Sequence, residues 1–196
     1  KFSSAKFASL KSSELIIGYS FTKSDELKID GHLTGDSKNF LGILNKAGLS
    51  MFNSKQRINI SGPLNAGLSL TIRPEDLTSV DGSIELHSDN LMLAFLKRDL
   101  VFKKTSGTAK YVIGKSFSAS NIQTSLDGLA VAGDISINKD SNHHEVLSFR
   151  GSVKGDGQKA LSFLKKKHIV SSQIAENLSA SGSFNSDINV FIPTSG

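Results

Sequence analysis

The chain has 196 residues, of which 38% are hydrophobic and 21% charged, and it has no cysteine. This composition excludes a disordered chain and a bundle of membrane-spanning helices. The lack of cysteine excludes a disulfide scaffold, a thiolate metal site and a cysteine nucleophile. The formal net charge of +5 is a modest basic bias that permits contact with anionic lipid without indicating it. Because the chain begins with Lys1 and not Met, we expect it to be a piece of a longer precursor.

Apolar and polar residues alternate along most of the chain, as they do from Leu68 to Ile72. A period of two places successive side chains on opposite faces of a strand, so each stretch predicts a strand with one apolar face. The 32 Ser and 17 Gly interleave with apolar residues, which is typical of many strands joined by tight turns. We predict strands over 2–10, 15–22, 26–33, 56–62, 66–73, 81–87, 91–96, 99–104, 108–113, 117–125, 129–137, 145–153, 175–182 and 186–192.

Two segments predict helices, 37–47 and 157–167. Each follows a Gly-Asp pair, and an Asp carboxylate is a good N-terminal cap because it accepts hydrogen bonds from the first backbone N–H groups. Lys165, Lys166 and Lys167 gather at the end of the second segment, where the helix dipole favours cations. This charge favours a solvated helix end over the alternative, a contact with anionic lipid head groups.

The chain contains an internal repeat. A shift of 120 positions superposes residues 27–72 on 147–192 without a gap, and 11 of the 46 pairs are identical, including Gly35-Asp36 with Gly155-Asp156. We therefore predict a single β-rich region, 1–196, built from a duplicated module at approximately 2–74 and 117–193, with linking strands over 81–113.

The predicted strands expose more apolar surface than two short helices can cover. A sheet with an apolar face must bury that face, so three arrangements remain: a sandwich, a filled barrel, or an open groove whose lining is covered by lipid. The repeat favours an extended, curved antiparallel sheet with an open groove and two short helices, because stacked modules grow in one direction.

Several segments also resemble a known family. The residues from Asp81 to Leu86, from Leu126 to Ile135, and the spacing of Gly31, Gly35 and Asp36 ahead of Phe40 are similar to the AsmA-like proteins of Gram-negative bacteria, specifically the YhdP/TamB group. The resemblance covers most of the chain and consists of glycine and apolar spacing. It implies a non-enzymatic segment of an intermembrane lipid-bridge protein in the periplasm, anchored to the inner membrane by a segment outside this chain. Phospholipid acyl chains would slide along the apolar β-groove toward the outer membrane.

The alternating apolar residues could form either a dry core or a lipid lining, and a one-residue slip would reverse the face. An alternative function is a structural or assembly module of the envelope that binds other β-proteins by strand addition. For the first function we predict the following lining residues: Leu68, Leu70, Ile72, Leu91, Leu93, Phe95, Ile135, Ile137, Phe149, Val190 and Ile192.

No motif predicts catalysis, a cofactor or a metal. Serines are abundant, but none stands in a Gly-x-Ser-x-Gly elbow, and His143-His144-Glu145 lies in a polar stretch that predicts a solvated loop. Aromatic residues make up 7% of the chain and do not interleave with basic ones, so we expect no nucleic-acid partner.

Overall fold

The structure, a computed structural model, describes residues 5–7, 10–20, 26–46, 58–73, 76–96, 99–139, 145–167 and 178–193. It is one open antiparallel sheet of 11 strands with two short helices, which confirms the predicted fold class. The elements are β1 (Ala5–Phe7), β2 (Leu10–Ser20), β3 (Glu26–Asp36), α1 (Ser37–Lys46), β4 (Ile58–Ser61), β5 (Pro63–Arg73), β6 (Asp76–Phe95), β7 (Leu100–Val112), β8 (Ser116–Leu126), β9 (Leu129–Lys139), β10 (Glu145–Asp156), α2 (Gly157–Lys166) and β11 (Ser183–Pro193).

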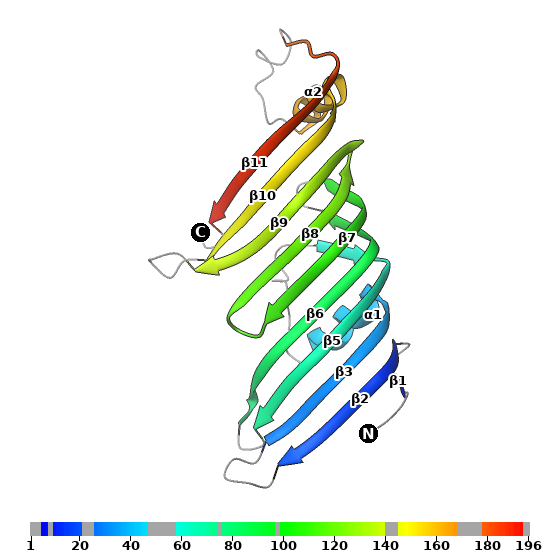
Figure 1. Cartoon of the computed structure of the whole chain (residues 1–196), viewed down its shortest axis with the longest axis vertical. Coiled ribbons are helices and arrows are strands. Elements are labelled where there is room, and N and C mark those ends of the chain that lie inside the picture. Colours follow the sequence, from blue (N-terminus) through cyan, green and yellow to red (C-terminus); the bar gives the residue numbers. More distant parts are fainter. Residues whose placement is uncertain are drawn as a thin grey trace.

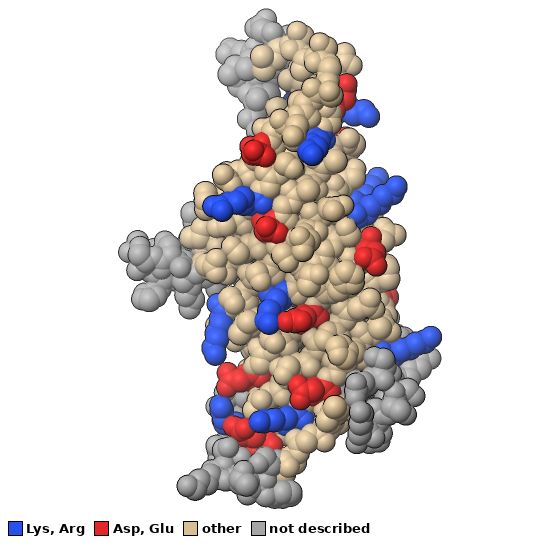
Figure 2. Space-filling view, in the orientation of Figure 1, with Lys and Arg blue, Asp and Glu red and all other residues tan. Residues whose placement is uncertain are grey.

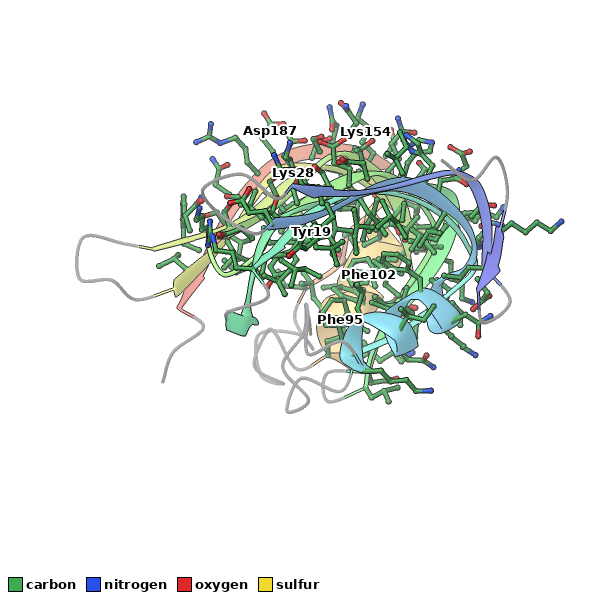
Figure 3. All side chains as sticks on the ribbon, turned by 90° about the horizontal axis from the view of Figure 1, so that it is seen from below. Tyr19, Lys28, Phe95, Phe102, Lys154 and Asp187 are labelled. Carbon is green, nitrogen blue, oxygen red and sulfur yellow. The ribbon has the colours of Figure 1, made fainter. Side chains whose placement is uncertain are left out.

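Strands that follow one another in the chain lie side by side in the sheet, in the order β1-β2-β3-β5-β6-β7-β8-β9-β10-β11. Strand β4 leaves this path and pairs with the far end of β6, in line with β5. The strands form a tall, twisted ladder (Figure 1), and an end-on view shows that the sheet curves over both helices (Figure 3). The described residues therefore form one curved layer with a convex and a concave face.

Both helices begin where a strand ends in Gly-Asp, as predicted. In α1 the carboxylate of Asp36 accepts a hydrogen bond from the backbone N–H of Lys38 at 2.9 Å. In α2 the carboxylate of Asp156 accepts one from the N–H of Lys159 at 3.1 Å. These bonds satisfy N–H groups that have no partner within the helix. The two helices thus start at the same end of β3 and β10 and lie on the concave side of the sheet (Figure 3).

The main core lies between α1 and the concave face. Phe40 and Leu44 of α1 are 2% and 4% exposed, and they pack with Leu64, Ala66 and Ile84 of the sheet. The apolar stripe of the helix points at the sheet because Phe40 and Leu44 are four residues apart and share a face.

Two strands are longer than predicted. Residues 81–87 and 91–95 belong to the single strand β6, and residues 99–104 and 108–113 fall largely within β7. Bulges explain the difference: the register shifts between Ser88 and Leu91, and Lys104 adopts a positive φ of 54°. A bulge interrupts the alternation of side chains while the strand continues on either side of it. The apolar and polar alternation in the sequence is therefore interrupted at positions where the strand is not.

The strand predicted over 175–182 is wrong for its described residues, 178–182, which form no strand. Their counterparts at a shift of 120 positions are residues 58–62, which contain β4, and β4 is a strand because it pairs with β6. No described strand follows β11, so residues 178–182 have no such neighbour. Instead Ala180 and Gly182 lie against Gly157 at the start of α2.

The two segments of the predicted repeat share their pairing. Strand β3 pairs with β5 from Leu27 opposite Ile72 onward, and β10 pairs with β11 from Leu147 opposite Ile192 onward, an offset of 120 in both strands. The N–H of Ser37 donates to the carbonyl of Gly62 at 2.9 Å, and its counterpart, the N–H of Gly157, donates to Gly182 at 2.8 Å. Duplication as the origin of this likeness stays a prediction.

Candidate functional site

The candidate site is the concave face of the sheet, which is apolar from β2 to β11. In an antiparallel ladder, residues directly opposite each other project from the same face. Tyr19 lies opposite Leu27, which lies opposite Ile72, and Figure 3 places Tyr19 on the concave side. At the other end of the sheet, Phe149 lies between Ile135 and Val190. The same parity connects the intervening strands, so one face carries most of the apolar residues of the sheet.

The structure places the predicted lining residues on this face. Phe95 projects to the concave side together with Phe102 (Figure 3), and their rings meet edge to face with centroids 5.7 Å apart. Ten of the eleven predicted side chains are partly buried there, and that of Ile192 lies outside the described residues. The ten are Leu68, Leu70, Ile72, Leu91, Leu93, Phe95, Ile135, Ile137, Phe149 and Val190.

Burial on the concave face falls from one end of the strands to the other. Leu64 and Ala66, near the helix end of β5, are 7% and 3% exposed, whereas Ile72 at the opposite end is only partly buried. On β2, Ile17 and Tyr19 lie toward that opposite end and are 49% and 44% exposed. The short hairpins β2–β3, β5–β6, β7–β8 and β9–β10 lie at this end, so we call it the hairpin half and the other the helix half. On the concave face, the large apolar side chains of Ile17 and Tyr19 are therefore incompletely covered in the hairpin half.

Some of the predicted lining residues contribute to the core. Leu68, Leu70 and Leu91 pack against the buried cluster under α1. The alternatives of dry core and open lining therefore apply to different parts of one face. Ile72, Ile135, Ile137, Phe149 and Val190 lie outside the described cluster and in the hairpin half.

The predicted set leaves out several residues of this face, among them Ile17, Tyr19, Leu27 and Ile29 on β2 and β3. Their signal was present, because both pairs alternate with polar or small residues inside the strands predicted over 15–22 and 26–33. They extend the apolar face to the first long strand of the sheet.

The convex face is polar and carries charges of both signs. Figure 2 looks onto this face and shows Lys, Arg, Asp and Glu scattered over most of the strands. Lys110 donates to Glu85 at 2.8 Å, and this bond lowers the pKa of the Glu85 carboxyl. Arg73 pairs with Asp81 at 3.1 Å. The convex face is therefore the more polar of the two, although the exposed Ile16 and Phe191 also project from it.

The basic end of α2 is tied to two turns of the sheet. The ammonium of Lys167 lies 2.8 Å from the Asp99 carboxylate in the β6–β7 turn, and Lys166 lies 3.9 Å from Asp127 in the β8–β9 turn. The hydrogen bond from Lys167 and its charge lower the pKa of Asp99. Two of the three lysines for which a head-group contact was the alternative therefore pair with carboxylates of the protein itself.

No helix in the described part of the chain is long and apolar enough to cross a membrane. Within the same residues, no group of three or more His, Asp or Glu side chains could hold a metal ion. The predicted loop at His143 and His144 lies outside the described residues.

Comparisons with protein-family models, with curated proteins and with solved structures found no significant match for this chain.

Proposed function

We propose that the chain is a periplasmic segment of an intermembrane lipid-bridge protein, which shields phospholipid acyl chains on the concave face of its sheet during transport to the outer membrane. The parent protein would be anchored to the inner membrane by a segment outside this chain. The proposed mechanism is passive: acyl chains exchange water for an apolar surface, and no residue performs chemistry.

One observation carries the proposal: a single-layered sheet keeps one apolar face across nine consecutive long strands, and its hairpin half is incompletely covered by the described residues. At a strand spacing of about 4.8 Å, this face is about 38 Å long across the strands. An acyl chain spans about 15 Å, half the hydrocarbon thickness of a bilayer. The face is therefore long enough for an acyl chain lying across the strands.

Burial without directional contacts is sufficient for this task. Each CH₂ group removed from water contributes about 0.8 kcal/mol. An apolar surface of this extent is unfavourable in contact with water unless another molecule covers it. The weak glycine and apolar spacing of the family resemblance fits such a surface, which requires no sharp motif.

Photo-crosslinking tests the proposal. A photoreactive amino acid at Ile135 or Ile137 of the concave face should crosslink to phospholipid in cells. The same amino acid at Asp134 or Asn138, which alternate with them on the convex face, should not. Equal crosslinking from both faces, or none from the concave positions of a folded protein, would contradict the proposal.

A charge on the concave face provides a second test. Ile137→Asp should abolish lipid co-purification, measured by mass spectrometry of extracted lipid, while the circular dichroism spectrum remains that of the β-sheet. Asn138→Asp makes a similar charge change on the convex face and should retain the lipid. Leu70→Asp is less suited, because Leu70 packs against the core under α1 and the variant would also test folding.

The alternative, an assembly module that binds other β-proteins by strand addition, would use the edges of the sheet and not its concave face. Among the described strands, β11 pairs with β10 alone. Ile137→Asp separates the two functions, because it should remove lipid binding and leave binding to an edge strand unchanged.

A further inference from the structure

Three β-bulges lie next to one another in the middle of the sheet, one each in β6, β7 and β8. The pairing register shifts between Ser88 and Leu91 in β6, between Lys103 and Ser106 in β7, and between Ala119 and Ile122 in β8. At each shift the strand has one residue more than its partner. The ladders β3–β5, β9–β10 and β10–β11 continue without a shift, so the bulges form a line across the central strands, which we call the bend line.

Each bulge places two consecutive side chains on the convex face. In β6, Ser88 and Leu91 project to the concave face, so Asp89 and Asn90 between them both face the convex side. Every residue of the three pairs is exposed: Asp89 and Asn90, Lys103 and Lys104, and Ser120 and Asn121. A bulge bends its strand, and the doubled side chains identify the convex face as the outside of the bend.

Side chains satisfy the backbone groups that two of the bulges release. In β6 the hydroxyl of Ser88 accepts a hydrogen bond from the N–H of Asn90 at 3.3 Å. In β8 the N–H of Asn121 donates to the carboxylate of Asp134 on the neighbouring strand at 2.9 Å. A bulge leaves its extra residue without a partner in the ladder, so these side chains replace the missing bonds.

The bulge in β7 is held by a pair of threonines. The hydroxyl of Thr124 donates to the carbonyl of Lys103 at 3.2 Å and lies 2.8 Å from the hydroxyl of Thr105. Ser88 and Thr105 are only 4% and 7% exposed, although both belong to the apolar concave face. A hydroxyl is buried at a cost unless it is hydrogen-bonded, so these polar groups have a use in the bend itself. The bend line is therefore a fixed feature of the fold.

We propose that the bend line shapes the apolar face into a groove, in which an acyl chain lies along the line and contacts both sides of the bend. The inference rests on the proposed lipid function and adds where the acyl chain is held. On β7, Phe102 lies opposite Leu93 and Tyr111 opposite Ile84, so both rings are on the concave face with the bulge between them. Side chains on the inside of a bend incline toward each other, and a concave site buries more of a ligand than a flat one.

Deletion of one residue tests the bulge in β8. Because Ser120 and Asn121 face the same side, deletion of Asn121 should restore regular pairing without moving any other side chain to the opposite face, and the variant should fold by circular dichroism. Deletion of Ser152 is the control, because β10 has no bulge and the residues beyond the deletion would change face. The control should lower the urea midpoint far more. Equal loss of stability in the two variants would contradict the bulge.

A distance measurement by electron paramagnetic resonance tests whether the bulge bends the sheet. Spin labels are attached at Ala130→Cys and Asn138→Cys, two exposed positions on the convex face of β9, since the chain has no cysteine of its own. The two positions lie on either side of the bend line. Labels on the outside of a bend point apart, so deletion of Asn121 should shorten the distance between them. An unchanged distance in the folded variant would overturn the proposal.

Glycine substitutions test the bulge in β7 without a change in chain length. Lys104 has a φ of 54°, a left-handed conformation that is unfavourable for any residue with a Cβ atom. Lys104→Gly should therefore leave the urea midpoint unchanged or raise it. Lys154→Gly, at an exposed position in the regular strand β10, should lower it, because glycine weakens a strand interior. An equal decrease in both variants would contradict the bulge in β7.

Lipid binding connects the bend line to the function. Deletion of Asn121 should weaken the binding of a phospholipid with a fluorescent acyl chain about tenfold, or about 1.4 kcal/mol, which is close to the burial of two CH₂ groups. Lys104→Gly, which keeps the bend, should bind as the unaltered chain does. Full binding by a deletion variant whose label distance has shortened would overturn the role of the bend and leave the proposed function intact. No binding by the unaltered chain would overturn the proposed function as well.

Discussion

Close contact between β9 and β10 at two glycines predicts that Gly133→Ala destabilises the sheet. Gly133 lies opposite Gly151, and a Cβ atom built on Gly133 would lie 2.7 Å from the Cα of Gly151 and closer still to the carbonyl oxygen of Arg150. These are backbone atoms of the neighbouring strand, so neither can rotate away. The strands would have to separate locally, and overpacking of this kind costs about 1–3 kcal/mol.

The matched control is Gly18→Ala on β2, where a Cβ atom would meet nothing within 4 Å. Alanine there restricts the unfolded chain and should stabilise the protein by about 0.5 kcal/mol. The two variants make the same chemical change and should shift stability in opposite directions, with a difference of about 2.5 kcal/mol for a mid-range cost at Gly133. With a urea dependence of about 2 kcal/mol per molar, their midpoints should differ by about 1 M, measured by far-ultraviolet circular dichroism. A midpoint for Gly133→Ala at or above that of Gly18→Ala would refute the close-contact reasoning.

Three further outcomes are expected. Ile84→Ala should cost about 2–5 kcal/mol in urea unfolding, because Ile84 is fully buried under α1 and its removal leaves a cavity; a loss below about 1 kcal/mol would indicate that the core collapses around it. Asp156→Ala should cost about 1 kcal/mol and speed hydrogen exchange at the Lys159 amide, while unchanged exchange would show that the cap is not formed in solution. Lys167 holds the pKa of Asp99 below its ordinary value of 3.8. The contact therefore stabilises the folded state fully at pH values above 3.8, and this stabilisation is lost as the pH falls through the lowered pKa. Asp99→Asn should therefore reduce the stability of α2 near neutral pH and flatten this acid dependence, as followed by hydrogen exchange across the helix; a variant with the original acid dependence would exclude the link.

Alternation was sufficient to predict the fold class and the segments that form most strands, because the apolar residues of the long strands fall mainly on one face. The Gly-Asp pairs located both helices, since a capped first turn leaves a local signature in the sequence. These features depend on residues close together in the chain.

What alternation could not predict depends on contacts between distant residues. The bulge at Lys104 and the positive φ of 54° at Asn121 break the pattern, and the N–H of Asn121 is satisfied by Asp134 on the neighbouring strand at 2.9 Å. Residues 178–182 alternate like a strand but have no described neighbour with which to pair. Likewise, sequence alone does not show that α1 buries Leu64 more completely than Ile72, because that difference depends on where the helix packs.

The pairing of each long strand with its neighbours in the chain has a mechanical consequence. In Figure 1 the first and last strands lie at opposite ends of the ladder, so a force that pulls them apart acts across the strands and loads one ladder at a time. Such a sheet should unzip from its edges at low force, and refolding should be fastest where a short turn joins two strands, as between β5 and β6 and between β7 and β8. A protein with this architecture would yield by losing terminal strands while its central hairpins, including those that hold Ile84, stay intact.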